Sequence, residues 1–174
     1  IAMYEDKIIQ ATTDARIVAL DARTGEQIWE TQIADNRQGF SNSSGPIVAD
    51  GMVISGLSGC TRYTPEDCYI SAYDADNGEL LWQFVTVAKM GEPGGDTWGG
   101  LDDIFRSGGD TWITGSYDPD LSLTYWGTAQ QKPWVPVSRH MTIFDIGLYT
   151  NSTVAVNVDN GNLDWYFQHV PAEA

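Results

Sequence analysis

Residues 18–29 read VALDARTGEQIW, and this phrase of twelve residues occurs three times in the chain. It returns as SAYDADNGELLW at residues 71–82 and as VAVNVDNGNLDW at residues 154–165. In each copy the fourth residue is Asp or Asn: Asp21, Asp74 or Asn157. A glycine follows it by four positions, and a tryptophan follows that glycine by four. The glycines are Gly25, Gly78 and Gly161, and the tryptophans are Trp29, Trp82 and Trp165. Three matches at one internal spacing indicate a repeat architecture.

Each copy of the phrase has the pattern of a β-hairpin. Small and apolar residues alternate before the turn, and the glycine accepts a positive φ at no steric cost. The tryptophan in the second strand is large enough to anchor one hairpin to its neighbour. Because a single hairpin is only marginally stable, three copies predict sheets that bury their faces against one another.

No stretch of any length has the 3.6-residue period of a helix, so we expect an all-β protein of short antiparallel units. The repeats favour a partial β-propeller of four-stranded blades, with a smaller sandwich as the alternative. Because a blade takes about 40–50 residues, residues 1–174 are expected to form a single domain of roughly three to four blades. Two polar or glycine-rich segments, residues 35–45 and 88–111, are expected to be functional loops. Residues 112–118 and 121–128 are expected to form a further hairpin.

Composition excludes some classes of function. The formal net charge is −15, which argues against a nucleic-acid partner, since phosphates attract Lys and Arg. No apolar run reaches the roughly 18 residues of a membrane helix, so no transmembrane segment is expected. The N-terminal residues do not have the pattern of a signal peptide.

Cys60 and Cys68 are close enough in sequence to close a small disulfide loop. Such a bond would place the protein in an oxidising compartment, periplasmic or extracellular. Two unrelated buried thiols are the alternative. A structural zinc site is disfavoured, because His140 and His169 have no matching spacing.

The phrase resembles the tryptophan-docking motif of the quinoprotein alcohol dehydrogenases, eight-bladed propellers that use pyrroloquinoline quinone (PQQ) and a metal ion. Residues 91–98 resemble that family's loop before the cofactor floor, and residues 111–119 resemble the segment with the tryptophan under the quinone. Residues 125–128 and 133–134 resemble the stretch Gly-Thr-Gly-Asn-x-x-Pro-Trp. The resemblance covers essentially the whole chain, as about the second to fourth blades of a larger propeller.

The resemblance assigns several residues to the cofactor. Trp112 matches the flat aromatic floor, on which a planar quinone stacks. Ser58 and Gly59 match the turn whose hydroxyl and backbone meet the cofactor's carboxylates, and Ser43 matches a threonine of the family with the same task. The alternatives are a tryptophan that packs between blades and serines that are merely solvated.

The metal ligands depart from the family pattern. Thr61 occupies the position of a glutamate, although Glu66 or Asp67 lies close in sequence. Gln130 occupies the position of an asparagine, and its amide oxygen is a donor of the type that hard cations accept. The resemblance therefore implies PQQ in the parent protein, whereas calcium or another metal ion is in doubt.

No residue of the chain is expected to be catalytic, because the family's aspartate base follows a segment that matches residues 169–171. The leading hypothesis is part of a dehydrogenase that oxidises an alcohol and passes electrons to a cytochrome, and the chain alone is expected to be inactive. The alternatives are a cofactor-free scaffold or interaction module, and a partial propeller that self-associates through its open edges.

Overall fold

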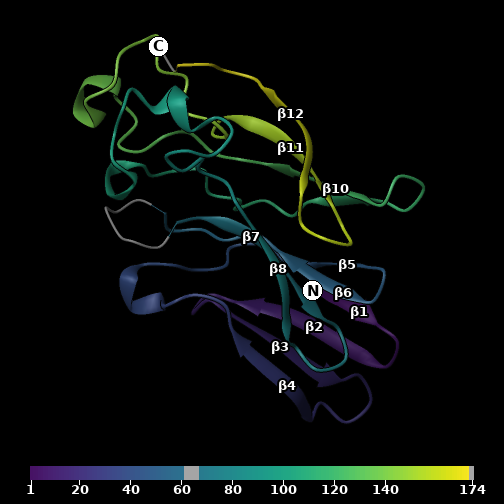
Figure 1. Cartoon of the computed structure of the whole chain (residues 1–174). Coiled ribbons are helices and arrows are strands. Elements are labelled where there is room, and N and C mark those ends of the chain that lie inside the picture. Colours follow the sequence, from purple (N-terminus) through teal and green to yellow (C-terminus); the bar gives the residue numbers. More distant parts are fainter. Residues whose placement is uncertain (61–66, 173–174) are drawn as a thin grey trace.

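The computed structural model describes residues 1–60 and 67–172. Its described residues form twelve strands in three four-stranded sheets (Figure 1). Four short 3₁₀ turns, and no α-helix, are found in these two ranges, as the absence of helical periodicity predicts. None of the helical segments is long and apolar enough to cross a membrane.

Each sheet follows the order of the chain, and every ladder within it is antiparallel. The first sheet contains β1 (Ala2–Tyr4), β2 (Lys7–Thr12), β3 (Arg16–Asp21) and β4 (Gln27–Gln32). The second contains β5 (Ile47–Ala49), β6 (Met52–Ser55), β7 (Tyr69–Asp74) and β8 (Leu80–Val85). The third contains β9 (Ser116–Asp118), β10 (Leu123–Gly127), β11 (Ser152–Asn157) and β12 (Leu163–Gln168). The 3₁₀ turns are η1 (Asn36–Gln38), η2 (Gly95–Trp98), η3 (Asp103–Phe105) and η4 (Pro136–Arg139).

The repeated phrase forms the third and fourth strands of each sheet together with the turn between them. In the first copy the Asp21 carboxylate accepts hydrogen bonds from the backbone N–H groups of Arg23 and Thr24, at 2.8 and 2.7 Å. Asp74 and Asn157 hold the second and third turns in the same way. The three turn glycines have φ between 73° and 76°, as the sequence predicts.

The second sheet is buried on both faces, because it lies between the other two (Figure 1). Adjacent residues of a strand point to opposite faces. Val53 accordingly packs in the apolar core shared with the first sheet, whereas Ile54 packs in the core shared with the third.

Tryptophans join the sheets at these cores. The Trp29 indole Nε1 donates to the Ala75 carbonyl at 3.1 Å, and Trp82 Nε1 donates to Val158 at 2.7 Å. A Cβ built on Gly78 would lie 2.6 Å from the Trp29 ring, and one on Gly161 would lie 2.7 Å from the Trp82 ring. Each indole therefore packs against the turn glycine of the following sheet.

One strand prediction was wrong at its start. A strand was expected from Trp112, but β9 begins at Ser116. The preceding residues leave the sheet because Thr111 bonds across to the end of the second sheet, where its N–H donates to Leu57 O at 2.9 Å. Residues 112–115 are thus free to present side chains away from the sheet.

Candidate cofactor site

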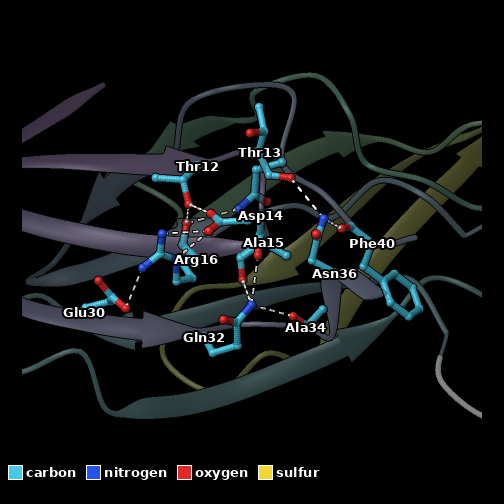
Figure 2. Close-up of polar contacts among 11 residues, drawn as sticks. Thr12, Thr13, Asp14, Ala15, Arg16, Glu30, Gln32, Ala34, Asn36 and Phe40 are labelled. Atoms are coloured by element: carbon cyan, nitrogen blue, oxygen red, sulfur yellow. Dashed lines mark hydrogen bonds and ion pairs between the residues drawn. The ribbon is translucent and has the colours of Figure 1, made fainter. Parts of the chain in front are cut away.

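The loop after the first sheet is fixed to that sheet by backbone carbonyls (Figure 2). The Gln32 amide donates to the carbonyls of Asp14, Ala15 and Ala34, all within 2.9 Å. The Asn36 amide donates to Phe40 O at 2.9 Å, which closes the loop on itself. These bonds hold the start of the loop against the turn between β2 and β3.

A short bridge then ties this loop to the segment after β6. Ser41 N donates to Ser58 O at 3.0 Å, and Ser58 N donates to Ser41 O at 2.9 Å. This antiparallel pair places the loop residues 42–45 beside the predicted Ser58–Gly59 turn.

Three predicted residues from separate segments meet at this point. The Ser43 hydroxyl donates to the Trp112 carbonyl at 3.0 Å, and it lies 3.1 Å from the Ser58 hydroxyl. The Thr114 hydroxyl donates to Gly45 O at 3.0 Å, so the two segments also touch beyond this point. The structure therefore brings together Ser43, Ser58 and the backbone of Trp112.

The Trp112 side chain is open to solvent. It is 53% exposed, whereas Trp98, in the similar stretch Gly-Gly-Asp-Thr-Trp, is fully buried and donates to Leu148 O at 2.7 Å. The sequence contains the stretch twice, at residues 94–98 and 108–112. Of these two copies, the second has the exposed indole, and its backbone carbonyl accepts from the Ser43 hydroxyl.

Gly59 shapes the turn through its backbone. Its φ is 93°, and a Cβ at this position would lie 2.1 Å from Gly39 O, so no other residue fits. Its N–H donates to the Asp110 carboxylate at 2.8 Å. The Ser58 hydroxyl, rather than the Gly59 N–H, is therefore the group of this turn that faces Ser43.

Asp110 is a functional candidate that the sequence analysis missed. Its Oδ1 accepts from the N–H groups of Gly59 and Cys60, at 2.8 and 3.2 Å, and its Oδ2 forms an ion pair with Lys132 Nζ at 2.9 Å. The side chain is 5% exposed. The sequence could not single it out, because Asp96 occupies the matching position in the other copy of the stretch and is exposed.

The Cys60–Cys68 disulfide predicted from the spacing is present, and both residues are buried. Their Cα atoms are 5.5 Å apart, within the range of a disulfide. The bond ends next to the Asp110 carboxylate, since the Cys60 N–H is one of its donors.

Comparison with known proteins identifies the family. The family model described as "PQQ: Glucose/ethanol/alcohol dehydrogenase, beta-propeller domain" matches residues 30–173. This chain belongs to that family. The resemblance noted in the sequence and the all-β, partial-propeller fold are thereby confirmed.

Relatives of this PQQ propeller family are much longer than the chain. Quinoprotein alcohol dehydrogenase PedH of Pseudomonas putida is 34% identical over 98% of the chain and 30% of its own length. Quinohemoprotein alcohol dehydrogenase ADH IIB of Pseudomonas putida is 36% identical over 100% of the chain and 26% of its own length.

Solved structures of relatives have the same fold as this chain. Quinohemoprotein alcohol dehydrogenase ADHIIG from Pseudomonas putida superposes with a TM-score of 0.87 at 30% identity, over 99% of the chain and 26% of that structure. A europium-containing methanol dehydrogenase superposes with a TM-score of 0.80 at 27% identity, over 98% of the chain and 32% of that structure. The chain thus spans about a quarter to a third of the length of these relatives.

Among the described residues, the donor set beside this surface does not fit a divalent metal ion. Within residues 1–60 and 67–172, one group of three acidic, thiol or imidazole side chains lies close enough to share an ion: Cys60, Cys68 and Asp110. The two sulfurs are joined in the disulfide, and the Asp110 oxygens face two N–H groups and an ammonium.

The residues predicted to bind metal do not complete such a set. Gln130 is half-buried, and its carbonyl accepts from Gly109 N at 3.3 Å. Asp67 is buried in an ion pair with Lys89, and burial raises the pKa of its carboxyl. Thr61 and Glu66 lie outside the described residues. Gln130 as a metal ligand therefore stays a prediction.

A hollow lies at the edge of the first sheet, away from the serines and Trp112. It has a volume of about 810 Å³ and is lined by Asp14, Gln32, Asp35, Arg37, Tyr69 and Gln83, among others. Its two acids are engaged, because Asp14 pairs with Arg16 at 2.6 Å and Asp35 with Arg37 at 3.0 Å. These ion pairs hold the pKa of both carboxyls below the usual range. We place no chemistry there.

Proposed function

We propose that this chain is part of a PQQ-dependent dehydrogenase that oxidises an alcohol to a carbonyl, and that it supplies the floor of the cofactor site. The observation that carries the proposal is the meeting of Ser43, Ser58 and Trp112, which come from three separate segments. Membership in the PQQ propeller family supports it.

The residues fit a flat, anionic ring system. The exposed Trp112 indole offers an apolar face on which a planar quinone stacks. The Ser58 hydroxyl lies 3.1 Å from the Ser43 hydroxyl and can rotate to donate to a carboxylate at the ring edge, whereas Ser43 would first have to give up its bond to the Trp112 carbonyl. When bound, PQQ supplies the acceptor for the two electrons of the alcohol.

We assign no catalytic base to this chain. Asp110 and Asp67, the buried acids nearest the site in sequence, are each paired with a lysine, and neither is free to take a proton from a substrate hydroxyl. We propose that another part of the protein supplies the base, and that residues 1–174 alone do not reduce a dye with alcohol and PQQ.

We also propose a location and partners. The buried Cys60–Cys68 disulfide supports folding in an oxidising compartment, periplasmic or extracellular. Several relatives are named quinohemoproteins, which supports a haem protein or cytochrome as the electron acceptor. The substrate class we propose is a small-molecule alcohol, as the names of the relatives state for those proteins.

The test is titration of the full-length protein with PQQ, followed by absorbance and tryptophan fluorescence. Trp112→Ala is expected to weaken binding about threefold to tenfold, because stacking contributes about 0.5–1.5 kcal/mol. Trp112→Phe keeps an aromatic face and should retain most of the affinity. The control is Leu121→Ala, an exposed residue in the turn beyond the far end of β9.

Two outcomes would count against the proposal. Equal affinity in Trp112→Ala and the unmodified protein would remove the floor role. No binding of PQQ by the full-length protein under any metal condition would favour the second candidate, a propeller that acts as a cofactor-free scaffold.

A further inference from the structure

We infer that Asp110 is a positioning residue of the candidate cofactor surface. Together with Thr111, it fixes the turn that carries Ser58 against the segment that carries Trp112. The inference rests on the proposed function and deepens it, because it names the contacts that set the distance between two proposed cofactor contacts. Neither Asp110 nor Thr111 was assigned to the site from the sequence.

One oxygen of Asp110 holds the backbone of the turn. Its Oδ1 accepts hydrogen bonds from Gly59 N at 2.8 Å and from Cys60 N at 3.2 Å, the two residues that follow Ser58. Hydrogen bonds to a carboxylate are stronger than those between neutral groups. The Asp110 side chain is 5% exposed, so its removal would leave these N–H groups without their acceptor in a largely buried place.

Thr111 holds the residue before Ser58. Its hydroxyl accepts from Leu57 N at 2.8 Å, and its own N–H donates to Leu57 O at 2.9 Å. A Cβ built on Gly56 would lie 2.2 Å from Thr111 O, so the two segments are in close contact. Ser58 is therefore bracketed by residues that are bonded to Asp110 or Thr111.

The same pair of residues leads directly into Trp112. The Asp110 carbonyl accepts from Ala129 N at 2.8 Å, which ties this segment to the exit of the third sheet. The Trp112 carbonyl in turn accepts from the Ser43 hydroxyl. A shift of residues 110–111 relative to residues 57–60 would change the distance between Ser58 and Trp112. A ligand that uses both binds more weakly when they have to be brought into place on binding.

The acceptor oxygen, and not the charge, is the property of Asp110 that the turn uses. Its carboxylate forms an ion pair with Lys132 at 2.9 Å through the other oxygen, so the pair has no net charge. An asparagine would keep an oxygen for the two N–H groups, but its amide N–H groups would face the ammonium. Lys132 therefore has to be changed together with Asp110 in a fair test.

The first experiment compares two double variants of the full-length protein by their Kd for PQQ. Asp110→Asn with Lys132→Gln keeps the acceptor and should bind within about threefold of the unmodified protein. Asp110→Ala with Lys132→Gln lacks the acceptor and should bind at least tenfold more weakly. Equal affinity of the two variants would overturn the inference and leave the proposed function intact. No binding of PQQ by the unmodified protein would overturn both.

Hydrogen exchange of the same two variants without PQQ tests the positioning directly. Amides of residues 57–60 should exchange faster in the alanine variant than in the asparagine variant. The control is Asp21→Ala, which also removes the acceptor of two backbone N–H groups, in the turn before β4. It should lower the melting temperature and leave both the Kd for PQQ and exchange at 57–60 unchanged. A loss of affinity equal to that of the alanine variant would overturn the inference.

A pair of threonine variants keeps the test decisive if the Asp110 variants do not fold. Thr111→Val removes the hydroxyl that accepts from Leu57 N and should weaken PQQ binding at least threefold. Thr128→Val removes another buried hydroxyl, which accepts from Ser152 N at 2.9 Å, and should leave the Kd unchanged. The same Kd in both variants would contradict the positioning role.

Discussion

The absence of a side chain at the turn glycines lets one sheet accept the tryptophan of the sheet before it. Gly161 shows this most clearly, because its missing Cβ would lie 2.7 Å from the Trp82 ring. Trp82 is also hydrogen-bonded to Val158 O, so the contact joins packing with a buried polar bond. The glycine is therefore needed for its small size as well as for its positive φ.

A comparison of two glycines separates the cost of a side chain at positive φ from the cost of its contact with the indole. Gly161 and Gly100 have nearly the same φ, 73° and 75°, but nothing lies within 4 Å of a Cβ built on Gly100. Gly100→Ala is expected to cost about 1 kcal/mol from backbone strain alone. Gly161→Ala should cost about 2–4 kcal/mol, since the indole must also move.

Denaturant unfolding of the full-length protein measures both free energies. Similar losses in the two variants would mean that the Trp82 contact contributes little, and that the glycine serves only the turn. A larger loss for Gly161→Ala would assign the difference to the contact between the sheets.

At the scale of the elements, the turn between the two strands of the repeated phrase depends on one side chain that accepts backbone hydrogen bonds. Hydrogen bonds from the backbone N–H groups of Thr24 and Arg23 hold the pKa of Asp21 below its usual range. Because the folded pKa lies below the unfolded one, the stabilisation is present above about pH 4 and is lost as the pH falls through the folded pKa.

Asp21→Asn should remove the part of the folding stability that depends on ionisation of Asp21. Asn157 fills the same position in the third copy and accepts the same two bonds, at 3.1 and 3.2 Å, so the amide is compatible with the turn. We expect the unmodified protein to melt above the variant at pH 7, with the difference shrinking below about pH 4. Melting curves from pH 7 to pH 3 check this, and a constant difference would contradict it.

The sequence predicted the elements better than the site. The three phrases placed β3–β4, β7–β8 and β11–β12 correctly, because hairpin turns and strand alternation are local properties. The start of β9 was missed, since Thr111 bonds to Leu57, which lies 54 positions away. The contacts of Asp110 with Gly59, Cys60 and Lys132 also join residues far apart in sequence, and no local pattern distinguishes buried Asp110 from exposed Asp96.

At the scale of the whole molecule, the outer strand β12 presents an apolar surface. Trp165, Tyr166 and Phe167 are 43%, 43% and 63% exposed, although Trp29 and Trp82 at the matching positions of the other sheets are buried. At the opposite end, nothing lies within 4 Å of a Cβ built on Gly25. Either surface is a place where a further sheet of this kind could pack.

We predict that the chain of 174 residues, produced alone, self-associates through these surfaces. Its net charge of −15 opposes the contact, so association should strengthen as salt screens the repulsion. Sedimentation velocity at low and high salt measures this. Trp165→Lys should give a monomer in both conditions, whereas Leu121→Lys should not; a monomer at every salt concentration for the unmodified chain would contradict the prediction.

The tryptophan bonds between sheets also imply an order of events during synthesis. Each sheet is built from consecutive strands, so its backbone pairing is complete once its own residues have left the ribosome. Trp29, however, finds its acceptor 46 positions later and Trp82 finds its acceptor 76 positions later. Each newly made sheet therefore waits with an uncovered indole until its successor emerges. A pause in translation inside residues 30–74 would prolong the exposure of Trp29, and one inside residues 83–157 would prolong that of Trp82. In both intervals a chaperone has an indole to bind.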